Sequence, residues 1–363
     1  MRALVYLGPG KAELQERPIP TLTAPDDVRV RVIGSGICGT DRKILLGHFP
    51  AEPGVILGHE SVGIVDACGP AVRSVSEGDR VVIDPTLYCG LCEQCRRGAT
   101  NHCRNKRGTE VGVDRDGTFA DYTVLPERFV HPLPRTLGFR DAVLIEPIAC
   151  CLSNLRAGAM TADDVVLVLG AGPIGSLCAL LAERTARRTV VCETDAYRLA
   201  EAGRRFRHVL DTSAGATPDT VRTATGGQLP SLVIDTTGVA LEDAIRLVDD
   251  GGRIVVMGFN NAHRATLSPL HLTNHGISII GAGDYRGAVF PSAIAHAAEL
   301  RPESLVTHEF PLEAYPEAFA SLDGVLPGGA AGPGYRAMKT VLRSSSGRLD
   351  AQGWPVDETR ENT

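Results

Sequence analysis

The chain has 363 residues, of which 43% are hydrophobic and 22% charged, and a formal net charge of −6. These values are typical of a globular protein with two domains and large cores. They exclude the basic surface that nucleic acids require, and no apolar run reaches the roughly 18 residues that a membrane span needs. We therefore expect neither a nucleic-acid nor a membrane partner.

The beginning of the chain lacks the apolar segment of a signal peptide, so a cytoplasmic location is expected. The chain contains ten cysteines. In this setting, cysteines indicate metal binding rather than disulfide bonds.

The first 150 residues contain short strand-like runs that are separated by Gly, Pro and Asp turns. The predicted strands lie within residues 3–7, 27–34, 54–68, 79–83 and 120–125. Such a series predicts a mostly antiparallel, barrel-like domain.

From about Ala157 the pattern changes to alternating strands and helices. Strands are predicted over 165–170, 189–193, 231–238, 253–259 and 277–283, and helices over 173–188, 197–206 and 242–248. This alternation predicts an α/β domain with a doubly wound parallel sheet.

The C-terminal part turns irregular after about residue 298 and then closes with a helix over 313–322 and a strand over 337–343. We place these elements back on the first domain. The predicted organisation is therefore a first domain over 1–152 completed by about 299–343, a second domain over 153–298, and a tail over 344–363. Composition predicts a flexible loop at 324–336 and a disordered or loosely docked tail.

Four cysteines follow the spacing C-x2-C-x2-C-x7-C, at Cys89, Cys92, Cys95 and Cys103. Four thiolates form a closed tetrahedral zinc site with no open position. This motif therefore predicts a structural zinc ion.

A second motif, GxGxxG, comprises Gly170, Gly172, Pro173, Ile174 and Gly175 and lies between a predicted strand and a predicted helix. This context is typical of dinucleotide binding, with the pyrophosphate at the helix N-terminus. Glu193 ends the next strand, where a carboxylate accepts hydrogen bonds from the ribose hydroxyls and repels a 2′-phosphate. NAD is therefore favoured over NADP, although Arg198 is close enough in sequence to leave NADP open.

A third set of residues supplies further metal ligands: Cys38 in GICGTD, His59 and Glu60 in LGHE, and Glu146 in LIEP. Cys, His and carboxylate ligands suit zinc, and a catalytic site keeps one position open. Together with the quartet, this set predicts two zinc ions per subunit.

These motifs, from GICGTD and LGHESVGIV through the cysteine quartet to IEP and GxGxxG, resemble those of the zinc-dependent medium-chain dehydrogenases over about residues 1–343. The resemblance implies a GroES-like catalytic domain and a Rossmann domain. It also implies that Cys38 and His59 bind zinc with Glu60, Glu146 or both, and these two are not ranked. Thr40 corresponds to the residue that takes the alcohol proton.

The resemblance further implies that Asp41 orients a zinc-bound histidine, although a local turn cap is an equal interpretation. It implies that Thr236, Gly258 and Gly283 line the cofactor pocket, and that the strand near 277–283 pairs across subunits in a homodimer or homotetramer.

The chain departs from many relatives at Lys43, where they carry a histidine that completes the proton relay, and at Ser153, which also replaces a histidine. We interpret Lys43, with Arg42, as facing an anionic or highly hydroxylated substrate, or else as a solvated surface pair. His48 is a further candidate for the relay.

The carboxylate at Glu146 is typical of the polyol and sugar branches, so the predicted reaction is hydride transfer between a secondary alcohol and NAD. The substrate would be a small hydroxylated molecule, namely a polyol, sugar or cyclitol, with or without an amino or phosphate group. Two alternatives remain open: oxidation of a threonine-type amino alcohol or an aldehyde, and a non-enzymatic zinc protein that binds NAD(H).

Overall fold

The computed structural model describes residues 1–323, 337–344 and 349–356. It divides into two compact units: Met1–Glu146 together with the residues from Arg286 on, and Pro147–Tyr285. The predicted loop at 324–336 lies outside the described residues. Within the described ranges, no helix combines the length and the hydrophobicity that a membrane span requires.

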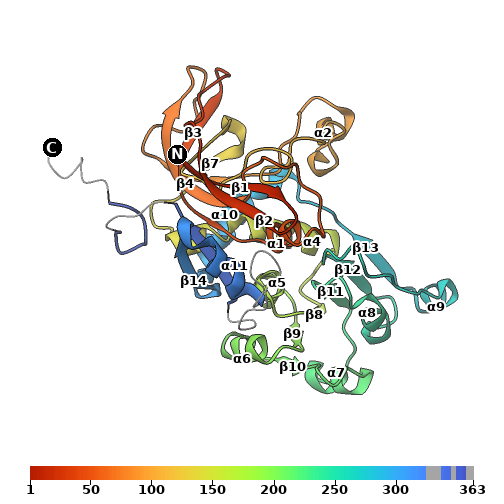
Figure 1. Ribbon diagram of the computed structural model, residues 1–363. Helices are drawn as coiled ribbons and strands as arrows, with labels where there is room; N and C mark the ends of the chain where they lie inside the picture. Colours follow the sequence, from red (N-terminus) through yellow and green to blue (C-terminus); the bar gives the residue numbers. More distant parts are fainter. Residues whose placement is uncertain (324–336, 345–348, 357–363) are drawn as a thin grey trace. The chain divides into compact units, whose positions relative to one another are not determined.

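The first unit is built mainly from strands. They are β1 (Arg2–Gly8), β2 (Lys11–Glu16), β3 (Asp27–Gly36), β4 (Glu60–Cys68), β5 (Arg80–Ile83), β6 (Tyr122–Pro126), β7 (Val130–Pro132), β14 (Val306–Pro311) and β15 (Lys339–Arg343) (Figure 1). Its main sheet has the order β14-β15-β3-β4-β5-β7, with β6 also on β3. Only the β14–β15 pair in this sheet is parallel.

The helices of the first unit are short. They are α1 (Gly39–Leu45), α2 (Glu93–Arg96), α3 (Phe139–Ala142), α10 (Phe290–Leu300) and α11 (Tyr315–Asp323). Helix α1 is held in place by Ile44, which is fully buried in a core that also contains Ile37 and Leu57. This packing fixes the segment between Ile37 and Ile44, where Cys38, Thr40 and Lys43 lie.

The strand predicted over 54–68 is interrupted. Strand β4 begins only at Glu60, because Gly58 adopts a left-handed backbone with φ +89°. A Cβ at this position would lie 2.5 Å from the Phe119 ring, so only glycine fits. The resulting turn brings His59 to the start of β4.

The second unit contains a six-stranded sheet in which every pairing is parallel. Its strands are β8 (Val165–Leu169), β9 (Arg188–Glu193), β10 (Val209–Asp211), β11 (Leu232–Asp235), β12 (Arg253–Val256) and β13 (Ser278–Gly281). Their order is β10-β9-β8-β11-β12-β13, the arrangement of a Rossmann fold. The predicted doubly wound parallel sheet is therefore confirmed.

The helices of this unit are α5 (Pro173–Glu183), α6 (Ala196–Arg205), α7 (Pro218–Thr225), α8 (Leu241–Leu247) and α9 (Pro269–His275), and α4 (Ile145–Ala157) leads into it. Helix α5 ends at Glu183, five residues before the predicted end. Residues 184–187 connect the helix to β9, because Arg188 already pairs with Val165 at the start of that strand.

The C-terminal tail differs from the prediction over residues 349–356. Trp354 is fully buried, and its indole Nε1 donates a hydrogen bond to the Leu137 carbonyl at 3.0 Å. Its ring packs edge-on against Phe139, and Arg80 stacks on it while pairing with Asp350. The apolar bulk of one tryptophan thus docks a segment that its polar composition had marked as loose.

Candidate active site

The four cysteines of the quartet come together in the first unit, around the short helix α2. Their ligand atoms all lie within 4.8 Å of one another. The Sγ–Sγ distances are 3.6 Å for Cys89–Cys103, 3.9 Å for Cys89–Cys95 and 4.0 Å for Cys92–Cys103. A tetrahedral zinc ion with bonds of about 2.3 Å requires sulfur atoms about 3.8 Å apart. The quartet therefore has the dimensions of a zinc site.

The backbone around the quartet favours thiolates at two of its members. The amides of Cys92 and Leu91 both donate to Cys89 Sγ at 3.4 Å and lower the pKa of Cys89 to about 6. Backbone hydrogen bonds also lower the pKa of Cys92. Burial, by contrast, raises the pKa of Cys95 to about 12. A coordinated thiol loses its proton outright, so a cation would resolve this imbalance.

The second metal-like set also assembles in the first unit. Cys38 precedes α1 and His59 precedes β4, and their ligand atoms lie with that of Glu60 within 4.8 Å of one another. Glu146 lies in the first turn of α4, is 8% exposed, and acts through its charge on His59. The structure thus brings together three of the residues proposed for the catalytic zinc, while the place of Glu146 among the ligands stays a prediction.

The electrostatics of this set suit a cation. The Nδ1 atom of His59 is buried and has no hydrogen-bond partner, while the whole side chain is 12% exposed. Burial lowers the pKa of His59, but the charges of Asp41 and then Cys38 outweigh it and raise that pKa well above its usual value. A buried imidazole among anionic groups is the environment that a zinc ion would neutralise.

Asp41 connects the two segments that carry these ligands. It is fully buried, and its carboxylate accepts hydrogen bonds from the Cys38 amide at 2.9 Å and the Gly58 amide at 3.1 Å. Its Oδ1 lies 3.7 Å from His59 Nδ1. Each of the two interpretations of Asp41, as a turn cap and as a residue that orients His59, is therefore supported by a contact. The carboxylate caps the turn at Cys38 and also lies beside His59.

Lys339, at the start of β15, joins the site although the sequence did not single it out. It forms an ion pair with Glu60, and the two side chains are only 4% and 2% exposed. Lysine is almost never buried without a partner. Its position in the apolar run AMKTVLR was therefore the one sequence signal that Lys339 pairs with a buried carboxylate. Finding the partner required the pairing of β15 with β3, and of β3 with β4.

Thr40 and Lys43 both lie on α1, within five residues of Cys38. Lys43 is half-buried, and burial followed by the charge of Arg42 lowers its pKa, against the effect of Cys38. Both interpretations of Lys43 stay predictions.

In the second unit, the GxGxxG loop joins β8 to α5. A Cβ at Gly175 would lie 1.9 Å from the Gly170 carbonyl oxygen, so this close packing requires glycine. Gly172 and Pro173 begin α5. The guanidinium of Arg198 lies beside the loop, where a Cβ at Gly172 would be 3.8 Å from its Cζ.

Glu193 and Thr236 are fixed against the same loop. Glu193 accepts hydrogen bonds from the Ala171 amide at 2.8 Å and from the Thr194 and Asp195 amides at 2.7 Å and 3.0 Å. The Thr236 hydroxyl donates to the Leu169 carbonyl at 2.8 Å. Glu193 and Thr236 thus lie beside the GxGxxG loop at the carboxyl ends of β9, β11 and β8, where the strand order reverses. Gly258 and Gly283 follow β12 and β13 at this edge.

Known proteins share these features. A family model described as an alcohol dehydrogenase GroES-like domain matches residues 24–135, and one described as a zinc-binding dehydrogenase matches residues 173–299. Sorbitol dehydrogenase of Rattus norvegicus is 32% identical over 329 residues, which cover 87% of this chain and 91% of the relative. The chain belongs to the zinc-dependent medium-chain dehydrogenase family.

Solved structures of this dehydrogenase family agree. The rspB protein of Escherichia coli CFT073, complexed with NADH, matches with a TM-score of 0.83 and 30% identity over 94% of this chain and 99% of that chain. A protein of Sinorhizobium meliloti 1021 bound to NADP matches with a TM-score of 0.83 and 29% identity, over 94% and 98% of the two chains. This chain is accordingly an alcohol or polyol dehydrogenase. Its family binds zinc and uses nicotinamide cofactors.

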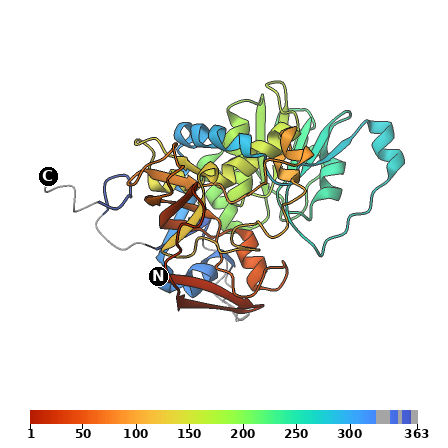
Figure 2. The same cartoon turned by 90° about the horizontal axis from the view of Figure 1, so that it is seen from above.

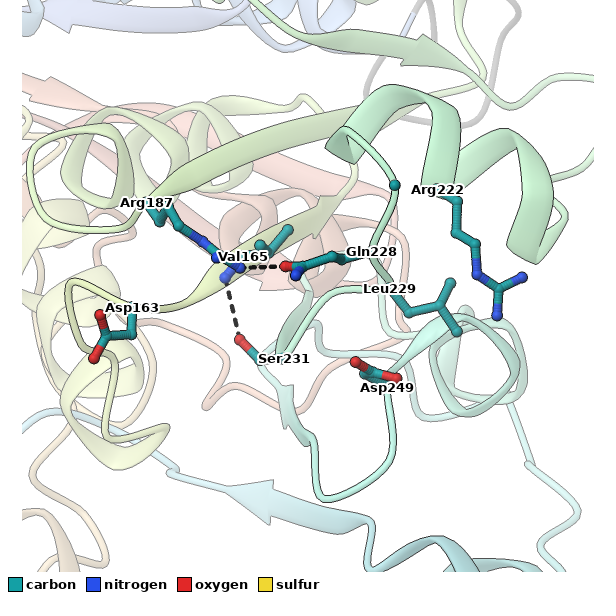
Figure 3. Close-up of a pocket in the computed structure, with 9 residues that line it drawn as sticks. Asp163, Val165, Arg187, Arg222, Gln228, Leu229, Ser231 and Asp249 are labelled. Carbon is teal, nitrogen blue, oxygen red and sulfur yellow. Dashed lines mark hydrogen bonds between the residues drawn. The ribbon is translucent and has the colours of Figure 1, made fainter.

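A cavity of about 320 Å³ lies at the other edge of the dehydrogenase's parallel sheet, where Val165 begins β8 (Figure 3). The Val165 amide donates to Ser231 Oγ at 3.1 Å, and the Arg187 guanidinium donates to Gln228. The cavity is lined by Asp163, Val165, Arg187, Arg222, Gly227, Gln228, Leu229, Ser231 and Asp249. Dinucleotides bind at the opposite, carboxyl edge, and none of these nine residues is a predicted site residue.

Proposed function

We propose that this enzyme oxidises a secondary alcohol of a polyol, sugar or cyclitol with NAD, and reduces the corresponding ketone in reverse. The observation that carries the proposal is the cluster of Cys38, His59 and Glu60, whose ligand atoms lie within 4.8 Å of one another. Its thiolate, imidazole and carboxylate suit zinc, and Glu146 adds the carboxylate typical of polyol branches. The similarity to a sorbitol dehydrogenase supports the same substrate class.

In the proposed reaction, Cys38, His59 and either Glu60 or Glu146 would hold the catalytic zinc. Zinc, when bound, supplies a Lewis acid that lowers the pKa of the substrate hydroxyl. Thr40 would accept the hydroxyl proton while its own hydroxyl proton passes to water, since it lies on the first turn of α1, two residues after Cys38. Asp41 would hold His59 in the orientation that binds zinc.

The cofactor proposal is NAD. It would lie with its pyrophosphate at the N-terminus of α5 and its ribose hydroxyls at Glu193. Three backbone amides already orient the Glu193 carboxylate, and a carboxylate has about four acceptor positions in all. Arg198, whose guanidinium lies beside Gly172, is a cation that would favour NADP.

The quartet of Cys89, Cys92, Cys95 and Cys103 would hold a second, structural zinc ion. Metal analysis of the purified protein is expected to give two zinc ions per chain. Cys38→Ser and Cys103→Ser are each expected to lower the count to one. The Cys38→Ser variant should lose activity yet keep its unfolding midpoint better than the Cys103→Ser variant. A wild-type count of one would show that one of the two sites is wrong.

A substrate panel tests the proposed activity. Polyols, cyclitols, free sugars, phosphorylated polyols and the amino alcohol threonine would each be offered with NAD, and NADH absorbance would be followed. We expect the highest kcat/KM for a polyol or cyclitol. A preference for threonine would overturn the substrate class, and no turnover of any secondary alcohol by zinc-loaded protein would overturn the activity.

The same panel tests Lys43 as a substrate-binding residue. Lys43→Met is expected to raise KM for the preferred substrate about tenfold, and more for a phosphorylated polyol, because a charged hydrogen bond contributes roughly 1.5–3 kcal/mol. Arg17→Met, which changes another half-buried cationic residue of the same unit, is the matched control. An equal loss on phosphorylated and free polyols would contradict phosphate recognition by Lys43.

We further propose a cytoplasmic enzyme that assembles as a homodimer or homotetramer. Strand β13 supports this assembly, since it lies at the end of its sheet and only half-buries Ile279 and Ile280. An edge strand of this kind is a template for pairing with a second copy.

A further inference from the structure

Two histidines stand one turn apart on α9, in the second unit. His271 and His275 are separated by four residues, so they share one face of the helix. Their ring centroids lie 4.3 Å apart with the planes at 43°. Figures 1 and 2 both show α9 at the outer end of this unit, beyond β13. The helix buries none of its residues, so packing does not account for this pair of imidazoles.

Local contacts fix the backbone at both histidines. The His271 amide donates to Ser268 Oγ at 3.3 Å, which caps the helix, and Gly276 ends it in a left-handed conformation. The His275 carbonyl accepts a hydrogen bond from the Gly251 amide at 2.7 Å. The helix is therefore short but held at both ends.

Asp250 contacts one nitrogen of the His275 ring. Its Oδ1 lies 2.7 Å from His275 Nδ1, while the His275 side chain is 42% exposed. A carboxylate on Nδ1 holds the proton there and leaves Nε2 of the neutral ring as an acceptor. This arrangement, in which a carboxylate orients a histidine from behind, is the one that metal-binding histidines use in proteins.

We propose that His271 and His275 form a surface site for a divalent transition-metal ion, with Asp250 as the carboxylate that orients His275. Imidazole nitrogens suit Cu²⁺, Ni²⁺ and Zn²⁺, and affinity rises toward Cu²⁺ in that series. Water would fill the remaining coordination positions. The site uses no cysteine and belongs to the second unit, so it is distinct from the two cysteine-containing sites of the first unit.

Binding of Ni²⁺ to the zinc-loaded, untagged full chain tests this site. Equilibrium dialysis followed by metal analysis is expected to give one Ni²⁺ per chain, with the zinc content unchanged. His271→Ala and His275→Ala should each weaken Ni²⁺ binding at least tenfold. Asp250→Asn should weaken it by about tenfold, the lower end of the effect of losing an orienting partner. The control is His263→Ala, which removes another half-buried histidine that faces a carboxylate, Glu242.

Cu²⁺ provides a second measurement, because its electron paramagnetic resonance spectrum reports coupled imidazole nitrogens. The wild type should show two, and each single histidine variant at most one. Thermal unfolding would establish that the variants fold, as expected for an exposed helix. The proposal is overturned if the two α9 variants bind Ni²⁺ as tightly as wild type, if His263→Ala loses binding equally, or if Ni²⁺ enters only by releasing zinc.

Discussion

Lys339 illustrates how one residue can decide the chemistry of its neighbours. Its ammonium pairs with Glu60 in a site where both side chains are almost fully enclosed. Burial lowers the pKa of Lys339, but the charges of Glu60 and Cys38 outweigh that effect and raise it. The lysine therefore stays protonated and compensates part of the negative charge that gathers around Cys38, Glu60 and Glu146.

Removal of this lysine should destabilise the first unit. In the zinc-free protein, Lys339→Met leaves the Glu60 carboxylate buried without its counter-ion, which is expected to lower the free energy of unfolding by about 3–5 kcal/mol. The double variant Lys339→Met/Glu60→Gln removes both charges and should recover most of that loss. Urea unfolding followed by fluorescence of Trp354, the single tryptophan, measures both variants. A double variant as unstable as the single one would refute the coupling.

At the scale of elements, β7 places a histidine where protonation is unfavourable. His131 stacks on Phe290 with ring centroids 4.9 Å apart, and burial lowers its pKa to about 4. In the unfolded chain a histidine titrates near 6.5. The unfolded state therefore binds a proton at a higher pH than the folded state does.

Stability should consequently fall in acid. The contribution of His131 is fully present above about pH 6.5 and is lost as the pH falls toward 4, by at most about 3 kcal/mol. His131→Leu removes the titration, so the stability of this variant should decline less over that interval. Urea unfolding at pH 7, 5.5 and 4.5 provides the comparison. If the difference in the free energy of unfolding between the wild type and the variant stayed constant with pH, this role of His131 would be ruled out.

The elements themselves were predictable wherever the pattern was local. Strands β3, β5, β8 and β9 and helices α6 and α8 fall within two residues or so of their predicted positions, since alternation and periodicity act over a few residues. Strand β10 and helix α9 were missed, because one is short and the other buries none of its residues and lacks an apolar face.

At the scale of the whole molecule, the edge strand β13 bears on assembly. Ile280→Lys puts a charge on this edge, which opposes strand pairing between two copies. Light scattering on a sizing column is expected to show the wild type as a dimer or tetramer and this variant as a monomer. Leu91→Lys, at a leucine that is 73% exposed in the other unit, is the control and should not change the mass. A monomeric wild type would contradict the proposed assembly.

The sequence by itself determined the chemistry that resides in short segments. The quartet spans fifteen residues, and the GxGxxG loop with Glu193 spans a single strand-helix-strand unit, so spacing alone sufficed to predict both. Only the tertiary structure placed Cys38 with His59, paired Lys339 with Glu60, and docked Trp354 on Leu137, 217 residues earlier. The physical reason is that such contacts depend on strand pairing and on burial of whole faces, which no local periodicity records.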